Sequence, residues 1–204
     1  MTERHQHWEA VYSNKATDQV SWFQPHAASS LRLITDCTNT DAHIIDVGGG
    51  ASVLVDDLLD AGYRNLTVLD LAQAALAVSQ ARLGERAKPV QWLAGDVTQV
   101  DLPIAQYDVW HDRAVFHFLT DPEDRARYVA QVLKSVKPGG HVIVATFGPG
   151  GPLQCSGLDV VRYAPDALHA EFGAPFRLLK HETEIHHTPS GKEQEFVYCY
   201  CVRV

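Results

Sequence analysis

The sequence of 204 residues contains no long apolar run, no cluster of basic residues and only four cysteines. No apolar stretch approaches the length of a membrane-spanning helix, and residues 1–7 lack the apolar core of a signal peptide. The 17 basic residues are outnumbered by 25 acidic ones, which gives a net charge of -8. A nucleic-acid binder usually shows a basic stripe, and none stands out here. We therefore expect neither a membrane nor a nucleic acid as a partner.

The cysteines do not have the spacing of a zinc knuckle or a thioredoxin motif, so a cytoplasmic location is expected. Cys199 and Cys201 are two residues apart on a strand-like run and therefore share a face, which is typical of small buried hydrophobic residues. Cys155 lies in a glycine-rich stretch, where its thiol can border a substrate pocket. If Cys155 meets Cys199 or Cys201 in space, a thiophilic substrate such as a metalloid becomes credible. The histidines near the C-terminus lack metal-ligand spacing, so we expect no metal site.

A hydrophobic content of 46% in a chain of this length predicts one globular domain with a full core, residues 1–204. We divide it into three segments. Residues 1–40 form a helical lead-in that acts as a lid, and residues 41–147 form a ligand-binding core. Residues 148–204 carry a substrate-side loop, a helix and a terminal hairpin.

Strand and helix patterns alternate along the core, which predicts a doubly wound α/β fold with a mostly parallel sheet and helices on both faces. Asp121-Pro122-Glu123 predicts a helix start. Two long strand-like runs at the end of the chain flank Thr188-Pro189-Ser190-Gly191-Lys192, which predicts an antiparallel C-terminal hairpin. Strands are expected at 43–47, 65–70, 89–94, 106–111, 140–147, 176–187 and 193–203, and helices at 51–61, 72–83 and 122–136.

The most informative stretch is Ile44-Ile45-Asp46-Val47-Gly48-Gly49-Gly50, an apolar strand that carries an acid near its tip and runs into a glycine turn. Glycines there let the backbone approach a ligand closely, with the next helix N-terminus facing it. A dinucleotide fingerprint needs another glycine where Val53 stands. Asp46 would also repel a pyrophosphate, whereas it suits an ammonium group. Asp70, at the tip of the second strand, is placed to accept two ribose hydroxyls.

Five motifs in order resemble those of the class I S-adenosylmethionine-dependent methyltransferases. Asp46-Val47-Gly48-Gly49-Gly50 and Leu69-Asp70 resemble the first two motifs, and Ala94-Gly95-Asp96-Val97 resembles the third. Residues 107–112 resemble the fourth strand of that family, and residues 133–140 resemble the turn before its fifth strand. The resemblance implies a Rossmann-like, seven-stranded sheet whose last strand is antiparallel. It also implies S-adenosylmethionine as the cofactor and S-adenosylhomocysteine as the product.

The resemblance implies a set of cofactor-binding residues as well. Asp96 would meet the adenine amino group, and Val97 would pack on the adenine ring. Tyr12 and Trp22, in the aromatic-rich lead-in, would cover the methionine end; the alternative is that both only pack that segment onto the sheet. The expected cofactor-binding residues are Tyr12, Trp22, Asp46, Gly48, Gly49, Gly50, Asp70, Leu71, Gly95, Asp96, Val97 and His111.

The end of the fourth strand is where this fold presents its chemistry, and it carries the expected catalytic residues Asp112, Arg113 and His117. His111 or Asp112 would touch the cofactor or the nucleophile, and Arg113 would fix an acidic group of the substrate. His117 would act as a base with a near-neutral pKa. The alternatives are a simple ion pair between Asp112 and Arg113 and a buried, hydrogen-bonded His117.

The whole pattern resembles a group of small bacterial methyltransferases of undefined substrate and, more distantly, the seven-strand protein-lysine methyltransferases. The latter carry Asp-Lys-Gly-Thr where this chain has Asp112-Arg113-Ala114-Val115, which argues against lysine methylation. We expect in-line methyl transfer to a small-molecule acceptor, in which positioning is the main task. The alternatives are protein-lysine or protein-histidine methylation, metalloid or thiol methylation using Cys155, and a non-catalytic cofactor-binding module. A NAD-type oxidoreductase is disfavoured by Val53 and Asp46, and the oligomeric state is left open.

Overall fold

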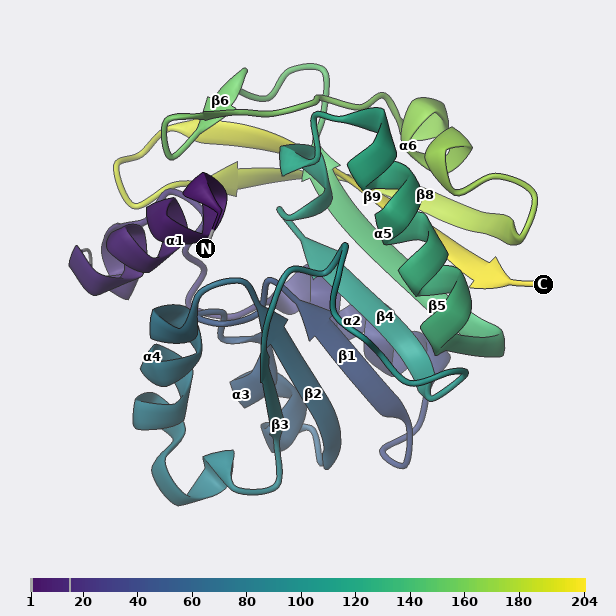
Figure 1. Cartoon of the computed structure of the whole chain (residues 1–204), viewed down its shortest axis with the longest axis horizontal. Coiled ribbons are helices and arrows are strands. Elements are labelled where there is room, and N and C mark those ends of the chain that lie inside the picture. The colour runs from purple at the N-terminus through teal and green to yellow at the C-terminus, as the bar shows by residue number, and fades with distance from the viewer. Residues whose placement is uncertain (1, 15) are drawn as a thin grey trace.

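A sheet of seven strands forms the centre of the computed structural model, which describes residues 2–14 and 16–204 (Figure 1). The strand order is β3-β2-β1-β4-β5-β9-β8, and every neighbouring pair is parallel except those that involve β9. The predicted Rossmann-like fold with an antiparallel C-terminal hairpin is therefore confirmed. The strands of this sheet are β1 (His43–Val47), β2 (Asn65–Asp70), β3 (Gln91–Ala94), β4 (Tyr107–Arg113), β5 (Val136–Phe147), β8 (Phe176–His187) and β9 (Glu193–Arg203).

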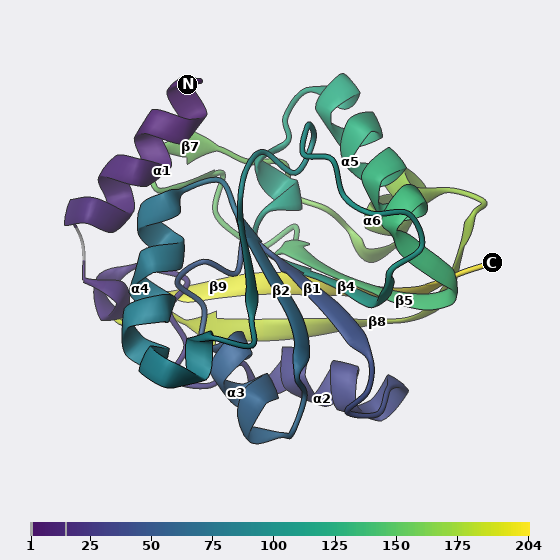
Figure 2. The ribbon, with the colours of Figure 1, turned by 60° about the horizontal axis from the view of Figure 1, so that its bottom comes forward.

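Helices cover both faces of the sheet (Figure 2). Side chains of α2, α3 and α4 belong to one buried cluster, and side chains of α5 and α6 belong to the other. None of the described helices is both long enough and apolar enough to span a membrane. The helices are α1 (Glu3–Asn14), α2 (Ala28–Cys37), α3 (Leu54–Asp60), α4 (Gln73–Leu83), α5 (Pro122–Ser135) and α6 (Pro165–Phe172), with short 3-10 turns η1 (Thr17–Gln19), η2 (Gly84–Ala87) and η3 (Phe116–Phe118).

Local sequence explains where α5 begins. The Asp121 side chain accepts a hydrogen bond from the backbone N–H of Glu123 at 2.8 Å, and Pro122 occupies the first turn, where its missing N–H costs nothing. Two boundaries differ from the sequence pattern. The glycine turn extends further than expected, so α3 begins at Leu54, and β5 begins at Val136 because that residue already pairs with Tyr107.

The segment after β5 contains more structure than the sequence pattern predicts. A short hairpin of β6 (Gln154–Cys155) and β7 (Leu158–Asp159) forms within the glycine-rich loop. The loop is fastened to the sheet, because the Glu195 side chain accepts a hydrogen bond from the backbone N–H of Gly150 at 3.0 Å. A Cβ atom at Gly148 would lie 2.3 Å from the same carboxylate, so any other residue there would push the Glu195 side chain away.

The order of the sheet reverses between β1 and β4, since β2 and β3 continue to one side and β5 to the other. Ligands of open α/β sheets bind outside the carboxyl ends of the strands at such a reversal. The register places Asp46 directly opposite His111, and Val47 opposite Asp112. The glycine turn and the residues after β4 therefore meet at one point of the carboxyl edge.

Candidate active site

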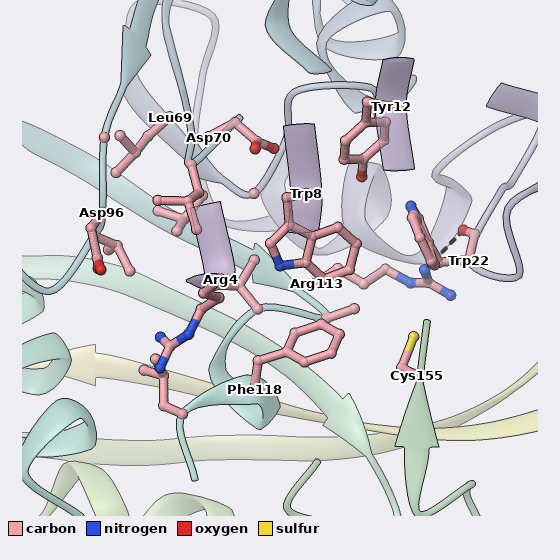
Figure 3. Close-up of a pocket in the computed structure, with 18 residues that line it drawn as sticks. Arg4, Trp8, Tyr12, Trp22, Leu69, Asp70, Asp96, Arg113, Phe118 and Cys155 are labelled. Carbon is pink, nitrogen blue, oxygen red and sulfur yellow. Dashed lines mark hydrogen bonds between the residues drawn. The ribbon is translucent and has the colours of Figure 1, made fainter. Parts of the chain in front are cut away.

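Two adjoining cavities lie at this edge of the sheet and share Tyr12, Trp22, Val47, Gly48 and Arg113. Of the expected cofactor-binding residues, all but Gly50 line at least one of them. Cavity I, beneath α1 (Figure 3), is also lined by Arg4, Trp8, Leu69, Asp70, Leu71, Gly95, Asp96, Val97, Ala114, Val115, Phe118, Leu119 and Cys155. Cavity II is also lined by Thr17, Val20, Phe23, Gln24, Ala27, Ser30, Asp46, Gly49, Ala51, Ser52, Val53, Leu54 and His111.

One carboxylate oxygen of Asp46 is hydrogen-bonded within the protein, and the other is left for a ligand. Its Oδ1 lies 2.7 Å from Nδ1 of His111, and Nε2 of His111 lies 2.8 Å from the hydroxyl of Ser30 on α2. A carboxylate can only accept, so we assign the imidazole proton to Nδ1 and the donor role at Nε2 to Ser30. Asp46 Oδ2 is buried and has no partner among the described residues. A buried carboxylate oxygen without a hydrogen bond is costly, and a positively charged donor is the group that would satisfy it.

The glycine turn lets a ligand reach this carboxylate. A Cβ atom at Gly49 would lie 2.2 Å from Asp46 Oδ2, so any other residue would displace that oxygen. Gly48 adopts a φ of 72°, and its Cβ would lie 2.0 Å from Val115. Both positions therefore require glycine, one for close approach and one also for backbone conformation.

Asp70, at the end of β2, is oriented by two backbone amides. Its Oδ2 accepts a hydrogen bond from Gly50 N–H at 3.0 Å, and its Oδ1 accepts one from Ala72 N–H at 2.9 Å. Burial raises the pKa of Asp70 to about 6, against the lowering effect of these two bonds. Each carboxylate oxygen keeps a second lone pair, and the side chain lines cavity I. The geometry suits two hydroxyl donors.

An aromatic cluster roofs the junction of the cavities. Trp8 and Tyr12 descend from α1, Trp22 follows η1, and Phe118 belongs to η3 (Figure 3). Ring centroids lie 5.2 Å apart for Trp8 and Phe118, 5.6 Å for Trp8 and Trp22, and 6.2 Å for Tyr12 and Trp22. Burial, and then the charge of Asp70, raise the pKa of Tyr12, so its hydroxyl stays protonated at neutral pH.

Helix α1 is fastened to both sides of cavity I. The Glu9 carboxylate accepts hydrogen bonds from Gln73 N–H at 2.6 Å and Ala74 N–H at 3.2 Å, at the N-terminus of α4. A negative charge at that end of a helix is stabilising. Towards the other end of α1, Arg4 forms an ion pair of 3.2 Å with Asp124 of α5.

Asp112 is fully buried and lines neither cavity. It accepts hydrogen bonds from Tyr128 Oη at 2.6 Å, Val115 N–H at 2.9 Å and Phe116 N–H at 3.1 Å. Burial raises its pKa to about 6. These contacts hold the turn after β4, in which Ala114 adopts a φ of 74° where the lysine methyltransferase motif has glycine.

His117 also lies outside both cavities. Its Nδ1 accepts a hydrogen bond from Phe147 N–H at 3.2 Å, and burial lowers its pKa to about 3. The expectation of a near-neutral pKa is therefore wrong, because the imidazole is sealed in the core and stays neutral. The alternative of a buried, hydrogen-bonded histidine describes it.

Arg113 is the one expected catalytic residue that lines the cavities, and it lines both. Its Nη2 lies 3.1 Å from Glu184, its Nε 3.2 Å from the Tyr198 hydroxyl, and its Nη1 3.4 Å from the Trp22 carbonyl oxygen. Its guanidinium lies 4.1 Å above the Phe196 ring. The partner of Arg113 is therefore Glu184 and not the adjacent Asp112. Burial raises the pKa of Glu184, but Arg113 and the hydrogen bonds outweigh it and lower that pKa overall.

The structure does not gather the cysteines. Cys155 packs in the core cluster on one face, and Cys199 and Cys201 pack in the other, with their sulfurs 3.7 Å apart. Within residues 2–14 and 16–204, no group of three or more His, Cys, Asp or Glu side chains is arranged to hold a metal ion. The condition set for a thiophilic substrate is not met.

Several residues that line the cavities, or that hold the lining residues in place, were not assigned a role from the sequence. Trp8 had a signal, because it shares a helix face with Tyr12 four residues on. Phe118 also had one, because it lies in the stretch after the fourth strand where the chemistry was expected. Ser30 and Glu184 had none, since their roles depend on which distant elements the fold brings to the carboxyl edge.

Comparisons with known proteins agree with this geometry. Residues 45–144 match the family model described as a methyltransferase domain. The mouse (Mus musculus) eEF1A lysine and N-terminal methyltransferase is 22% identical over 143 residues, covering 67% of this chain and 20% of that protein. The malonyl-[acyl-carrier protein] O-methyltransferase of Halalkalibacterium halodurans is 30% identical over 141 residues, covering 65% of this chain and 51% of that protein. The chain thus spans between a fifth and a half of the length of these relatives.

Solved structures share the fold over nearly the whole chain. A structure described by the conversion of a disulfide bond into a thioacetal group during echinomycin biosynthesis has a TM-score of 0.80 at 15% identity, covering 98% of this chain and 92% of that one. The N-methyltransferase NodS of Bradyrhizobium japonicum WM9, in complex with S-adenosyl-L-homocysteine, has a TM-score of 0.74 at 14% identity, with 99% of both chains covered. The sheet order, the motifs and the family match together identify residues 45–144 as a class I S-adenosylmethionine-dependent methyltransferase domain, with S-adenosylmethionine as its cofactor.

Proposed function

We propose that this protein transfers the methyl group of S-adenosylmethionine to a small, largely apolar acceptor that binds in cavity I. The observation that supports this proposal is the make-up of the wall opposite Asp96. Figure 3 shows Asp96 on one side of the cavity and Trp22 and Cys155 on the other, with Trp8 and Phe118 between them. Three segments far apart in sequence supply these side chains, and most of the wall they form is apolar.

The residues of the cavities fit the cofactor. The unpaired Oδ2 of Asp46 suits the ammonium group of its methionine end, and Asp70 suits the two ribose hydroxyls. Asp96, whose Oδ1 accepts from the backbone and hydroxyl of Thr98 at 2.9 and 2.7 Å, is held ready for the adenine amino group, and Val97 for the adenine ring. When bound, S-adenosylmethionine supplies a methyl group on a positively charged sulfur.

The protein's own contribution is alignment and exclusion of water. Tyr12 and Trp22 cover the junction of the two cavities, so they shield the point where methionine and ribose subsites meet. Holding an acceptor against rigid aromatic walls supplies orientation, which is worth several kcal/mol in a displacement reaction. The protonated Tyr12 hydroxyl can donate a hydrogen bond to an acceptor at that junction.

The closed roof favours a small acceptor over a polypeptide. Helix α1 is fastened to α4 through Glu9 and to α5 through Arg4. A protein segment would have to displace α1 to bring a side chain beneath Trp8, whereas a small molecule needs only a brief opening.

The proposal is tested by incubating the protein with methyl-labelled S-adenosylmethionine and cell extract, and then separating products by size. The expected result is a new labelled compound in the small-molecule fraction, resolved by chromatography from unreacted S-adenosylmethionine and absent when the protein is omitted. Label in the protein fraction would refute the small-molecule proposal in favour of protein methylation. Calorimetry should show binding of S-adenosylhomocysteine and none of NAD. Tight S-adenosylhomocysteine binding without any labelled product would indicate a non-catalytic cofactor-binding module.

A further inference from the structure

Cavity II has walls of two opposite charges. Among its lining residues, Asp46 is the only carboxylate and Arg113 the only guanidinium or ammonium group, and His111 is engaged by Asp46 and Ser30. The amino-acid end of S-adenosylmethionine carries an ammonium and a carboxylate on the same carbon. A site for it is complementary when it offers one anion and one cation, and these walls offer that pair.

The Arg113 side chain is held in place by the protein and still has N–H groups that can donate hydrogen bonds to a ligand. A guanidinium carries five N–H groups, and the described partners Tyr198, Trp22 and Glu184 account for three of them. The side chain is only 9% exposed and stacks on Phe196, so its position is fixed before any ligand arrives. One N–H group on Nη1 and one on Nη2 are left over, and a guanidinium N–H forms a strong, charge-assisted hydrogen bond with a carboxylate.

We infer that Arg113 binds the carboxylate of the methionine end of the cofactor, opposite the ammonium bound by Asp46. This inference rests on the proposed function and deepens it. Arg113 is then a cofactor-binding residue, and its positioning residues are Glu184 and Tyr198, which hold the guanidinium from behind. The acidic group that Arg113 was expected to bind is then the carboxylate of the methyl donor and not a group of the acceptor.

The experiment is calorimetry with two probes that differ only in this group. One is S-adenosylhomocysteine, and the other is S-adenosyl-3-thiopropylamine, which is the same molecule without its carboxylate. We expect the unmodified protein to bind S-adenosylhomocysteine about 10- to 100-fold more tightly. Arg113→Gln should bring this ratio below about threefold, and Arg113→Lys, which keeps the charge without the fork, should give an intermediate ratio.

Two further variants make the readout specific. Arg32→Gln removes a more exposed ion pair between α2 and β8, with Glu182, outside both cavities, and should leave the ratio unchanged. Asp46→Asn should weaken both probes and preserve the ratio, because it acts on the ammonium. Thermal unfolding checks that each variant is folded; if Arg113→Gln is not, the ratio of Arg113→Lys decides.

The inference is overturned if folded Arg113 variants keep the full ratio. It is equally overturned if they bind S-adenosylhomocysteine normally but raise the KM for the acceptor, since Arg113 would then read the acceptor. Failure of the proposed function looks different, because the label would then appear in the protein fraction or in no product at all, while the ratio between the two probes would be unaffected.

Discussion

Gly50→Ala is the sharpest single test of how the cofactor site is built. The Cβ added by this change would lie 2.6 Å from Ala75 Cβ and 2.6 Å from Asp70 Oδ2. Non-bonded carbon atoms prefer about 3.5–4.0 Å, so roughly 1 Å must be made up. Ala75 Cβ is fixed to α4, and the Asp70 carboxylate is held by two backbone amides, so neither atom can move away freely.

The expected cost has two components. Inserting a methyl group into a packed site destabilises the fold by about 1–3 kcal/mol. Shifting the Asp70 carboxylate weakens the hydrogen bonds that we propose it forms with the ribose hydroxyls, each worth about 1.5–3 kcal/mol when one partner is charged. We therefore expect S-adenosylhomocysteine affinity to fall about 10- to 100-fold, together with a lower free energy of unfolding.

Calorimetry and denaturant unfolding measure the two components separately. Gly95→Ala is the matched control for stability, because its Cβ would meet Val100 at an ordinary 3.6 Å and should cost little. If Gly50→Ala binds S-adenosylhomocysteine as tightly as the unmodified protein, then Asp70 is not the ribose ligand and the contact between turn and carboxylate is irrelevant to binding.

Three further predictions concern separate parts of the site. We propose that the ionised form of Asp70 accepts the ribose hydroxyls, and burial raises its pKa to about 6; affinity for S-adenosylhomocysteine should therefore be constant above that pH and fall as the pH drops through it. Calorimetry between pH 5 and 8 checks this, and an equally steep fall in Asp70→Asn would contradict it. Glu9→Gln removes the charge that holds α1 on the α4 N-terminus, worth about 1 kcal/mol, so stopped-flow dissociation of S-adenosylhomocysteine should quicken about fivefold; an unchanged rate would mean that α1 does not control release. Tyr128→Phe leaves the Trp110 N–H without its partner and removes one of the two donors to Asp112 Oδ2, which keeps the Phe116 N–H, and it should cost about 1–3 kcal/mol of unfolding free energy; a loss of S-adenosylhomocysteine affinity in the folded variant would show that Asp112 does more than hold its turn.

The cofactor half of the site could be predicted because strand ends fix it. β1 and β2 were located at residues 43–47 and 65–70 from apolar runs alone; β1 carries an acid just before its last residue, and β2 ends on one. In a parallel sheet these ends lie at one edge, so Asp46 and Asp70 had to lie near each other. Nothing beyond local pattern and sheet geometry was needed.

The proposed acceptor half could be predicted only in part: Cys155 was expected to border a substrate pocket, but the side chains that share its wall were not. Its wall is assembled from α1, η3 and β6, whose side chains Trp8, Phe118 and Cys155 are separated by more than a hundred residues of chain in total. Their meeting depends on tertiary contacts of loops and of a helix with no strong apolar stripe. The β6–β7 hairpin is itself hidden in a glycine-rich stretch that reads as a loop.

The neighbours Asp112 and Arg113 do not form the ion pair that their adjacency in sequence suggests, and the geometry of a strand explains why. Successive side chains of a strand point to opposite faces of the sheet, so adjacent residues within β4 cannot form an ion pair across it. Asp112 accordingly turns to Tyr128 of α5, while Arg113 turns to Tyr198 and Glu184 on the other face. His111 shares the Arg113 face and meets Asp46 of β1, which lies directly opposite it in the register. The alternation of β4 therefore divides its last three residues into two that face the cofactor cavity and one that braces the turn behind it.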